Sequence, residues 1–154
     1  MTISEILDKK GRYVHTVEIH TSVYDAVKKL DETKAGAMLV LNEKEELEGL
    51  VSERDILYKC YNSGVPLKEN EIKNLMTKSD KLIVARLDDT ALYLMNVMTQ
   101  KQIRHIPVLN DEEVIISIIS IEDVLKAVLE TSQTEAKMLR EHIKNPFGVH
   151  IYKT

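Results

Sequence analysis

An internal repeat constrains this sequence more than any other feature, because a duplicated sequence predicts a duplicated structural unit. Shifting the 154-residue chain by 68 positions places residues 4–62 over residues 72–130 without a gap. Most of the identical residues lie in two clusters: Val40, Leu41, Asn42, Ser52, Asp55 and Leu57 match Val108, Leu109, Asn110, Ser120, Asp123 and Leu125. We therefore expect two copies of one small fold.

Each copy contains an amphipathic helix, because apolar residues recur at positions i, i+3, i+4 and i+7. These are Val23, Ala26, Val27 and Leu30 in the first copy and Ala91, Leu94, Met95 and Met98 in the second. Ser22 and Thr90 directly precede the two helices and are predicted N-caps. Asp25 is the third helical residue and is predicted to complete a capping box with Ser22.

Short apolar runs flank both helices and predict strands. They are residues 14–19, 38–41 and 47–51 in the first copy, and 82–87, 106–109 and 114–119 in the second. Polar turns, NEKEE and NDEE, separate the last two runs of each copy, and a closing helix follows Ser52 or Ser120. Each copy is thus predicted to be β-α-β-β-α.

Neither copy alone would bury much apolar surface, so the two are expected to pack together. We predict an α+β fold in which the repeats form a pseudo-twofold pair, with the sheets facing each other and the helices outside. Residues 1–66 are assigned to the first repeat with an N-terminal segment, and residues 67–130 to the second. A C-terminal helical extension and tail occupy residues 131–154, with a helix running from Val124 toward Lys144.

Composition excludes several classes of protein. The net charge of −4 argues against a nucleic-acid partner, and no apolar run approaches the roughly 20 residues that cross a bilayer. The single cysteine, Cys60, cannot form an internal disulfide, which together with the absence of a signal sequence predicts a cytoplasmic protein. No metal site is expected, because the spacing of His15, His20, His142 and His150 fits none. No catalytic motif is found, so we expect no catalytic residues and no enzyme.

Several segments resemble the CBS (cystathionine β-synthase) domain. They are Met76-Thr77, the LIV strand at 82–84, RHIPVLN, SIISIEDV and, in the first copy, GLVSERDI. The whole chain is similar to a stand-alone tandem pair, called a Bateman module. This resemblance implies adenosine ligands bound in clefts between the repeats: AMP, ADP, ATP or NAD(H), and less readily S-adenosylmethionine. It also implies a homodimer that passes its signal to an unidentified protein partner.

The resemblance implies a nucleotide site in the second repeat. Asp123 would accept hydrogen bonds from the ribose hydroxyls, with Ser120 beside it, although both residues also suit helix capping. Arg104 and His105 would bind phosphate, although a basic pair is commonly just a solvated corner. The remaining candidates are Thr77, Leu82 and Val84 near adenine, Ile106 and Ile118 on the purine face or in the core, and Pro107 at the strand start.

A weaker site is expected in the first repeat. Its candidates are Val14, Thr16, Ala37, Met38, Leu50, Ser52, Arg54 and Asp55. Gly36 and Ala37 stand where the second repeat has Arg104 and His105, so this site is predicted to keep the ribose end and lack the phosphate end. Arg54, Lys10 or Arg12 could supply charge instead, and Arg54 could equally pair at a dimer contact. The site would hold a nucleoside, the other end of a dinucleotide, or nothing.

A second departure concerns the glycine that the family has before its Ser-x-x-Asp motif. Gly49 retains it in the first repeat, and Ser117 replaces it in the second. A side chain at that position would be expected to narrow the second cleft.

Two functions are therefore weighed. The favoured one is a regulatory sensor that binds an adenine nucleotide and changes conformation. The alternative is a dimerisation scaffold without a nucleotide ligand. An enzyme with His105 as general base is a third possibility, but no nucleophile or metal cluster lies beside this histidine in the sequence.

Overall fold

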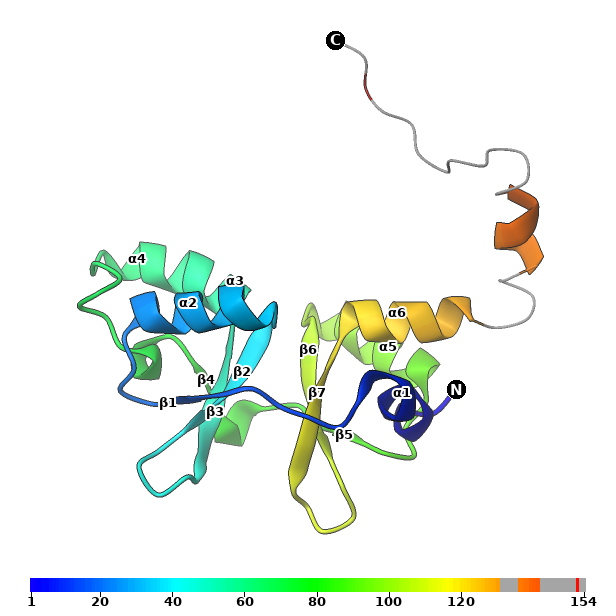
Figure 1. The fold of residues 1–154 in the computed structure, drawn as a ribbon, viewed down its shortest axis with the longest axis horizontal. Helices are drawn as coiled ribbons and strands as arrows, with labels where there is room; N and C mark the ends of the chain where they lie inside the picture. The colour runs from blue at the N-terminus through cyan, green and yellow to red at the C-terminus, as the bar shows by residue number, and fades with distance from the viewer. Residues whose placement is uncertain (131–135, 142–151, 153–154) are drawn as a thin grey trace.

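The computed structural model describes residues 1–130, 136–141 and 152. It shows two halves side by side, each with a small mixed sheet and with helices on its outer side (Figure 1). The first half contains β1 (Thr16–Glu18), α2 (Val23–Thr33), β2 (Ala37–Leu41), β3 (Leu47–Ser52) and a helical run divided into α3 (Glu53–Asp55), η1 (Ile56–Cys60, a π-helix) and α4 (Tyr61–Ser63). The second contains β5 (Ala85–Arg86), α5 (Ala91–Lys101), β6 (His105–Leu109), β7 (Ile115–Ser120) and α6 (Ile121–Leu129). The predicted α+β pair of repeats is confirmed.

The two central helices begin where their caps predict. The Ser22 hydroxyl accepts a hydrogen bond from the backbone N–H of Asp25, and the Thr90 hydroxyl accepts one from that of Tyr93. The capping box predicted for Asp25 is not formed, because only the Ser22 half of the exchange is present. Complete boxes occur instead at the two closing helices, as described below.

The two β-hairpins have the same turn. The Asn42 side-chain oxygen accepts hydrogen bonds from the backbone N–H groups of Lys44 and Glu46, and Asn110 repeats this arrangement in the second hairpin. Short polar side chains that bond the backbone two residues on favour such turns. The turns set the register that pairs Ala37 with Ser52 and His105 with Ser120.

The first-repeat sheet has one strand more than the second. Its order is β1-β2-β3-β4, where β4 (Thr77–Lys78) comes from the second half of the sequence, whereas the other sheet is β5-β6-β7. The short helices η2 (Ile72–Asn74) and η3 (Ser79–Lys81) flank β4. Among the residues that the structure describes, strand β7 therefore has no outer neighbour where β3 has β4.

Segments are exchanged between the halves. Helix α1 (Ile3–Lys10) packs into the core of the second half, beside α5 and α6 (Figure 1). Conversely, Ile72 and Leu75 are buried in the core of the first half. Similar backbone hydrogen bonds fix both exchanges. The N–H of Ile3 donates to the carbonyl of Asp89, and the N–H of Ile72 donates to the carbonyl of Thr21. Thr21 corresponds to Asp89 in the repeat. The segment before each repeat's first strand thus packs on the other repeat.

Three apolar clusters hold the protein together. One lies between each sheet and its helices, and the third joins the inner faces of the two sheets. The buried members of this third cluster are Ala37, Leu39, Leu50 and Ile118. The expectation that the sheets face each other is therefore confirmed by side-chain packing.

The predicted C-terminal helix from Val124 is confirmed as far as Leu129, but its unbroken continuation toward Lys144 is wrong. Helix α6 ends at Leu129, and Glu130 lies in a turn. Residues 136–141 are again helical, and the rest of the expected extension lies outside the described residues, as do His142 and His150. Among the helices of the described residues, none is long and apolar enough to cross a membrane.

Candidate functional site

Two cavities open where the halves meet. The larger, the Asp123 cleft, has a volume of about 890 Å³. It is lined by side chains of both repeats, among them Lys10, Tyr13, Val14, His15, Gly36, Ala37, Glu53, Arg104, His105, Ile118, Ser120, Glu122 and Asp123. The smaller, the Asp55 cleft, has a volume of about 650 Å³ and is lined by Leu50, Ser52, Glu53, Arg54, Asp55, Leu57, Tyr58, Thr77, Lys101, Gln102, Ile103, Arg104 and His105.

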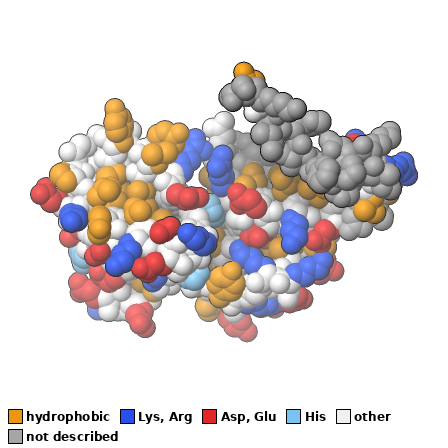
Figure 2. Space-filling model, turned by 45° about the horizontal axis from the view of Figure 1, so that its top comes forward, with side chains coloured by type: hydrophobic (Ala, Val, Ile, Leu, Met, Phe, Trp, Pro, Cys, Tyr) orange, Lys and Arg blue, Asp and Glu red, His pale blue; other side chains and the backbone are white. Residues whose placement is uncertain are grey.

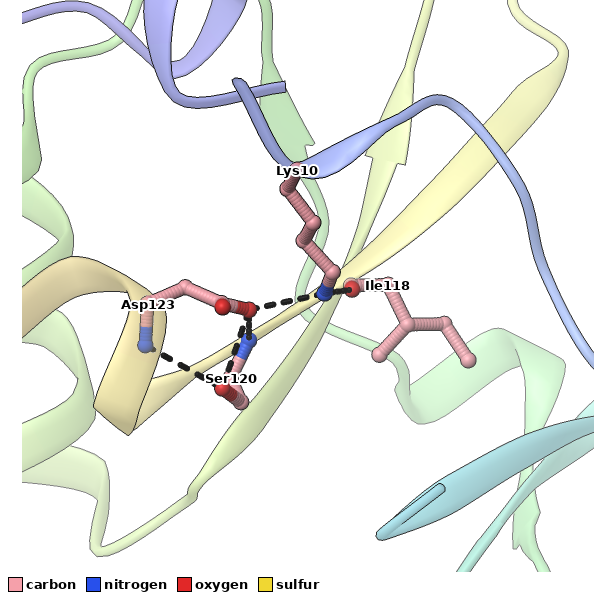
Figure 3. Close-up of polar contacts among 4 residues, drawn as sticks. All are labelled: Lys10, Ile118, Ser120 and Asp123. Atoms are coloured by element: carbon pink, nitrogen blue, oxygen red, sulfur yellow. Dashed lines mark hydrogen bonds and ion pairs between the residues drawn. The ribbon is translucent and has the colours of Figure 1, made fainter. Parts of the chain in front are cut away.

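Asp123 is held in one orientation by the start of α6. Its Oδ2 accepts hydrogen bonds from the backbone N–H and the hydroxyl of Ser120, each at 2.9 Å, and the Ser120 hydroxyl accepts one from the Asp123 N–H (Figure 3). This complete capping box confirms the capping interpretation. No described residue donates to the other carboxylate oxygen, Oδ1. An oriented carboxylate with one open oxygen suits recognition of a diol.

Lys10 supplies the third donor to this carboxylate. Its ammonium lies 2.7 Å from Asp123 Oδ2 and 2.6 Å from the carbonyl oxygen of Ile118 (Figure 3). Burial acts to raise the pKa of Asp123, but the hydrogen bonds from Lys10 and Ser120 and the Lys10 charge outweigh it, so the pKa lies below its ordinary value. Asp123 is therefore ionised at neutral pH.

Asp55 has the same capping box with Ser52, but its free oxygen is taken. Oδ2 accepts from the Ser52 N–H and hydroxyl at 3.0 Å each. Oδ1 forms an ion pair of 2.9 Å with Lys59, one helical turn along, whose ammonium also donates to the Leu75 carbonyl. Both carboxylate oxygens are thus engaged in the Asp55 cleft.

Arg104, His105, Glu53 and Leu57 line both cavities and form a shared wall. The register of β6 and β7 places His105 opposite Ser120, so the predicted approach of the basic pair to Ser120 and Asp123 is confirmed. The imidazole packs against Gly36, where an added Cβ would lie 2.5 Å from His105 Nε2.

The protonation of His105 is set mainly by its surroundings in this wall. Burial lowers its pKa, and Lys10 acts in the same direction. The nearby carboxylates of Glu122, Glu53 and Asp123 oppose this lowering without cancelling it.

The structure places several predicted residues in the cleft of the other aspartate. Thr77 was predicted beside Asp123 but lies in the Asp55 cleft, where β4 pairs with β3. Val14 and Ala37 were predicted beside Asp55 but line the Asp123 cleft. For Thr77 and Val14 the cause is the segment exchange, since the chain before each first strand crosses to the other repeat, whereas Ala37 begins β2 and packs between the sheets. Arg54, considered as a charge for the first-repeat site, lines the Asp55 cleft together with Lys101 and Arg104, which sequence reasoning did not place there.

Other predicted residues lie outside both cavities. Ile106 and Met38 are fully buried beneath the helices, so Met38 does not belong to the first-repeat site, and for Ile106 the core alternative holds in place of the purine face. Pro107 is buried opposite Ile118, and Leu82 packs between the sheets. Thr16 lies within β1, where its carbonyl accepts from Lys29, and Val84 is exposed beside β5. Leu50, Ser52 and Arg54 line the Asp55 cleft as expected, and Ile118 lines the Asp123 cleft.

Sequence reasoning missed or misplaced several cavity residues. Tyr13 and His15 line the Asp123 cleft because the chain from α1 to β1 crosses it, and Lys101 lines the Asp55 cleft at the end of α5. Lys10 was considered as a charge for the first-repeat site and instead binds Asp123. The 68-residue shift could have indicated that Lys10 lies at a site, because it aligns Lys10 with Lys78, and Lys78 follows the candidate residue Thr77.

Comparison with known proteins agrees with this architecture. The CBS domain pattern matches residues 3–62 and again residues 72–130. The mitochondrial CBS domain-containing protein CBSX3 of Arabidopsis thaliana is 33% identical over 152 residues, covering 95% of this chain and 73% of its own. A putative signal-transduction protein with CBS domains from Burkholderia ambifaria has a structure similar to this one (TM-score 0.78, 32% identity, 86% of this chain and 97% of that one).

A structure of CBSX2 in complex with AMP is also similar, with a TM-score of 0.64 and 25% identity over 84% of this chain and 96% of that one. The matched residues include both Ser-x-x-Asp motifs and all the strands that face each other across the two clefts. The chain therefore belongs to the CBS domain family, as a pair of CBS repeats.

Proposed function

We propose that this protein is a regulatory module that binds an adenine nucleotide in the Asp123 cleft and signals through the resulting change between its two halves. AMP is the first candidate, and ADP, ATP and NAD(H) follow; S-adenosylmethionine is less suited. The compartment and the regulated protein partner stay predictions.

The observation that carries this proposal is the state of Asp123. A capping box orients its carboxylate, its lowered pKa keeps it charged, and Oδ1 accepts no hydrogen bond from the described residues. Vicinal ribose hydroxyls would donate to it, while apolar Val14, Ala37 and Ile118 line the same cavity. CBSX2, a similar pair, has been crystallised with AMP, which supports an adenine nucleotide as the ligand.

Calorimetric titration with AMP, ADP, ATP, NAD, NADH and S-adenosylmethionine tests the proposal. We expect at least AMP to bind and to raise the melting temperature, since a ligand that binds only the folded state stabilises it. Asp123→Ala should weaken AMP binding by about 10- to 100-fold through the loss of charge-assisted hydrogen bonds. If no member of the panel gives heat or a thermal shift, the sensor function is rejected and the scaffold alternative is favoured.

Asp25→Ala is the matched control for this substitution. Asp25 is also the third residue of a helix with a serine N-cap, but it is exposed and lines neither cleft. It should leave AMP affinity unchanged. A loss of affinity shared by Asp25→Ala and Asp123→Ala would indicate a general structural effect instead of ribose binding.

We also infer that the active form is a homodimer joined through the helices. Leu57 and Tyr61 on the helical run of the first half are 65% and 84% exposed, and Tyr24 lies exposed on α2. The second half repeats this face, because exposed Leu92 and Leu125 correspond to Tyr24 and Leu57. Figure 2 shows hydrophobic side chains gathered over the half that carries α2 and α4. A face that repeats under a pseudo-twofold axis suits self-association of two copies.

Light scattering coupled to size-exclusion chromatography measures this assembly. We expect the wild-type chain to be dimeric and the double variant Leu57→Asp, Leu125→Asp to be monomeric, because each charge would be buried at the contact. Val114→Asp, at an exposed position at the tip of a hairpin, is the control and should stay dimeric. A monomeric wild-type protein at micromolar concentration would exclude the dimer.

A further inference from the structure

We propose that Lys10 makes the Asp123 cleft select adenosine ligands with an anionic 5′ group. This inference rests on the proposed function and names the residue that sets its ligand class. Lys10 is the last residue of α1, a helix whose other end is fixed in the second-half core by Ile3 and Leu7. The side chain therefore starts from a rigid position beside the cleft.

The place of Lys10 becomes clear when the two sheets are compared. In the first sheet, Thr77 of β4 pairs with Leu50 of β3. Leu50 corresponds to Ile118 of β7, beside which the described part of the chain places no further strand. There the Lys10 ammonium donates to the Ile118 carbonyl. The Asp55 cleft thus has the backbone of β4 at this point, and the Asp123 cleft has the positive charge of Lys10.

The Lys10 ammonium is held in place by two partners and can still donate one hydrogen bond to a ligand. An ammonium has three N–H donors, and the structure engages two of them, with Asp123 Oδ2 and the Ile118 carbonyl. The Lys10 side chain is only 22% exposed and lines the cavity, so solvent screens its charge weakly. A ribose on Asp123 Oδ1 would bring the ligand's 5′ substituent into the same cavity. A phosphate there would gain a charge-assisted bond, whereas the sulfonium of S-adenosylmethionine would be repelled.

The test compares AMP, adenosine and S-adenosylmethionine by calorimetry. Working in an Asp55→Ala background confines ribose binding to the Asp123 cleft. The parent should bind AMP more tightly than adenosine, and adenosine more tightly than S-adenosylmethionine. Lys10→Met should reduce the preference for AMP over adenosine by about tenfold or more, the range for one charge-assisted hydrogen bond. Lys10→Arg should retain the preference.

Lys9→Met is the control, since Lys9 lies in the same helical turn and forms a 2.8 Å ion pair with Glu130, but does not line the Asp123 cleft. It should leave the preference unchanged. Equal changes for AMP and adenosine in Lys10→Met would overturn the inference, because Lys10 would then act only by competing for Asp123 or by supporting the fold. Equal affinity of the parent for AMP and S-adenosylmethionine would overturn it without any Lys10 variant. Failure of every adenosine compound to bind the wild-type chain would instead reject the proposed function, and this inference with it.

Discussion

The Asp123 cleft and the Asp55 cleft carry the same Ser-x-x-Asp motif and the same capping box, yet the lysine that binds each carboxylate contacts a different oxygen. Lys10 binds the oxygen of Asp123 that already serves the cap, which leaves Oδ1 open. Lys59 binds the oxygen of Asp55 that the cap leaves free. A ligand entering the Asp55 cleft therefore meets a carboxylate whose second oxygen already carries an ion pair, and it must share or displace that pair. A shared motif does not imply equal binding, because the surroundings decide which lone pairs remain.

The difference extends to the strand position before the motif. In the first repeat, a Cβ on Gly49 would lie 2.3 Å from the Thr77 carbonyl, so β4 requires glycine there. In the second repeat, residues 1–130 and 136–141 contribute no fourth strand beside β7, and Ser117 is fully buried at the matching position. The prediction that Ser117 narrows the cleft is wrong, because this residue does not line it.

The largest expected effect concerns the two residues that sequence reasoning placed in the sites and that the structure places in the cores. Ile106→Ala and Met38→Ala should each lower the free energy of unfolding by about 2–5 kcal/mol, because each leaves a cavity at a fully buried position. Denaturant unfolding measures this loss. Below the unfolding transition both variants should bind AMP with nearly wild-type affinity. If the Ile106→Ala protein were stably folded but no longer bound AMP, the interpretation of Ile106 as a purine contact would be favoured again.

The next effect compares the two aspartates directly. Asp55→Ala should weaken AMP binding much less than the 10- to 100-fold expected for Asp123→Ala, since Lys59 already occupies the free oxygen of Asp55. Lys59→Met should then increase binding in the Asp55 cleft by releasing that oxygen. Calorimetric stoichiometry separates the two clefts. Equal losses from Asp55→Ala and Asp123→Ala would mean that the ion pair with Lys59 does not control access.

A third effect tests the missing strand. Gly49→Ala should destabilise the protein by about 1–3 kcal/mol, because the new methyl group meets backbone that must move. Ser117→Ala should be neutral or stabilise it by about 1 kcal/mol, since within the described residues the buried Ser117 hydroxyl has no hydrogen-bond partner. Thermal unfolding compares the two variants. Similar destabilisation by both would show that a fourth strand or its equivalent also covers β7 in solution.

The smallest expected effect is a pH dependence of AMP affinity that arises from His105 in the shared wall. Burial holds the pKa of His105 below 6.5, so the free protein carries a neutral imidazole at pH 7. A bound phosphate favours the imidazolium and raises that pKa, so binding favours uptake of a proton by His105, and this residue makes AMP affinity rise as the pH falls through the raised pKa. The gain should stay below about tenfold, the value of one pKa unit. His105→Asn should remove the histidine's share of the pH dependence and leave that of the AMP phosphate, whose second pKa is about 6; an unchanged profile would place the phosphate away from His105.

The duplicated pattern was enough to predict the β-α-β-β-α order, the helix caps, the hairpins and the facing sheets, because these depend on local periodicity and on one buried interface. It was also enough to bring His105 toward Asp123, since a hairpin joins their strands. It could not predict which half receives residues 1–15 and 71–78. Either half could bury α1 on pattern alone, and only the packing of Ile3, Ile6 and Leu7 against the second core decides it.

This one undetermined exchange explains most of the misplaced site residues. Thr77 and Val14 were correctly chosen as cavity residues and assigned to the wrong aspartate. The alternation along β2 and β6 was a usable signal that was not applied. Side chains alternate between the two faces of a strand, so Ile106 must face away from its neighbours His105 and Pro107.

The exchange of α1 also affects how the protein is made. A ribosome releases Ile3 and Leu7 first, but their partners Leu94, Ile119 and Val124 follow only after about ninety to one hundred and twenty further residues. The first half in turn stays incomplete until Ile72 and β4 emerge. Neither repeat can therefore finish folding while it is the only one synthesised, and the two should mature together once β7 and α6 have emerged.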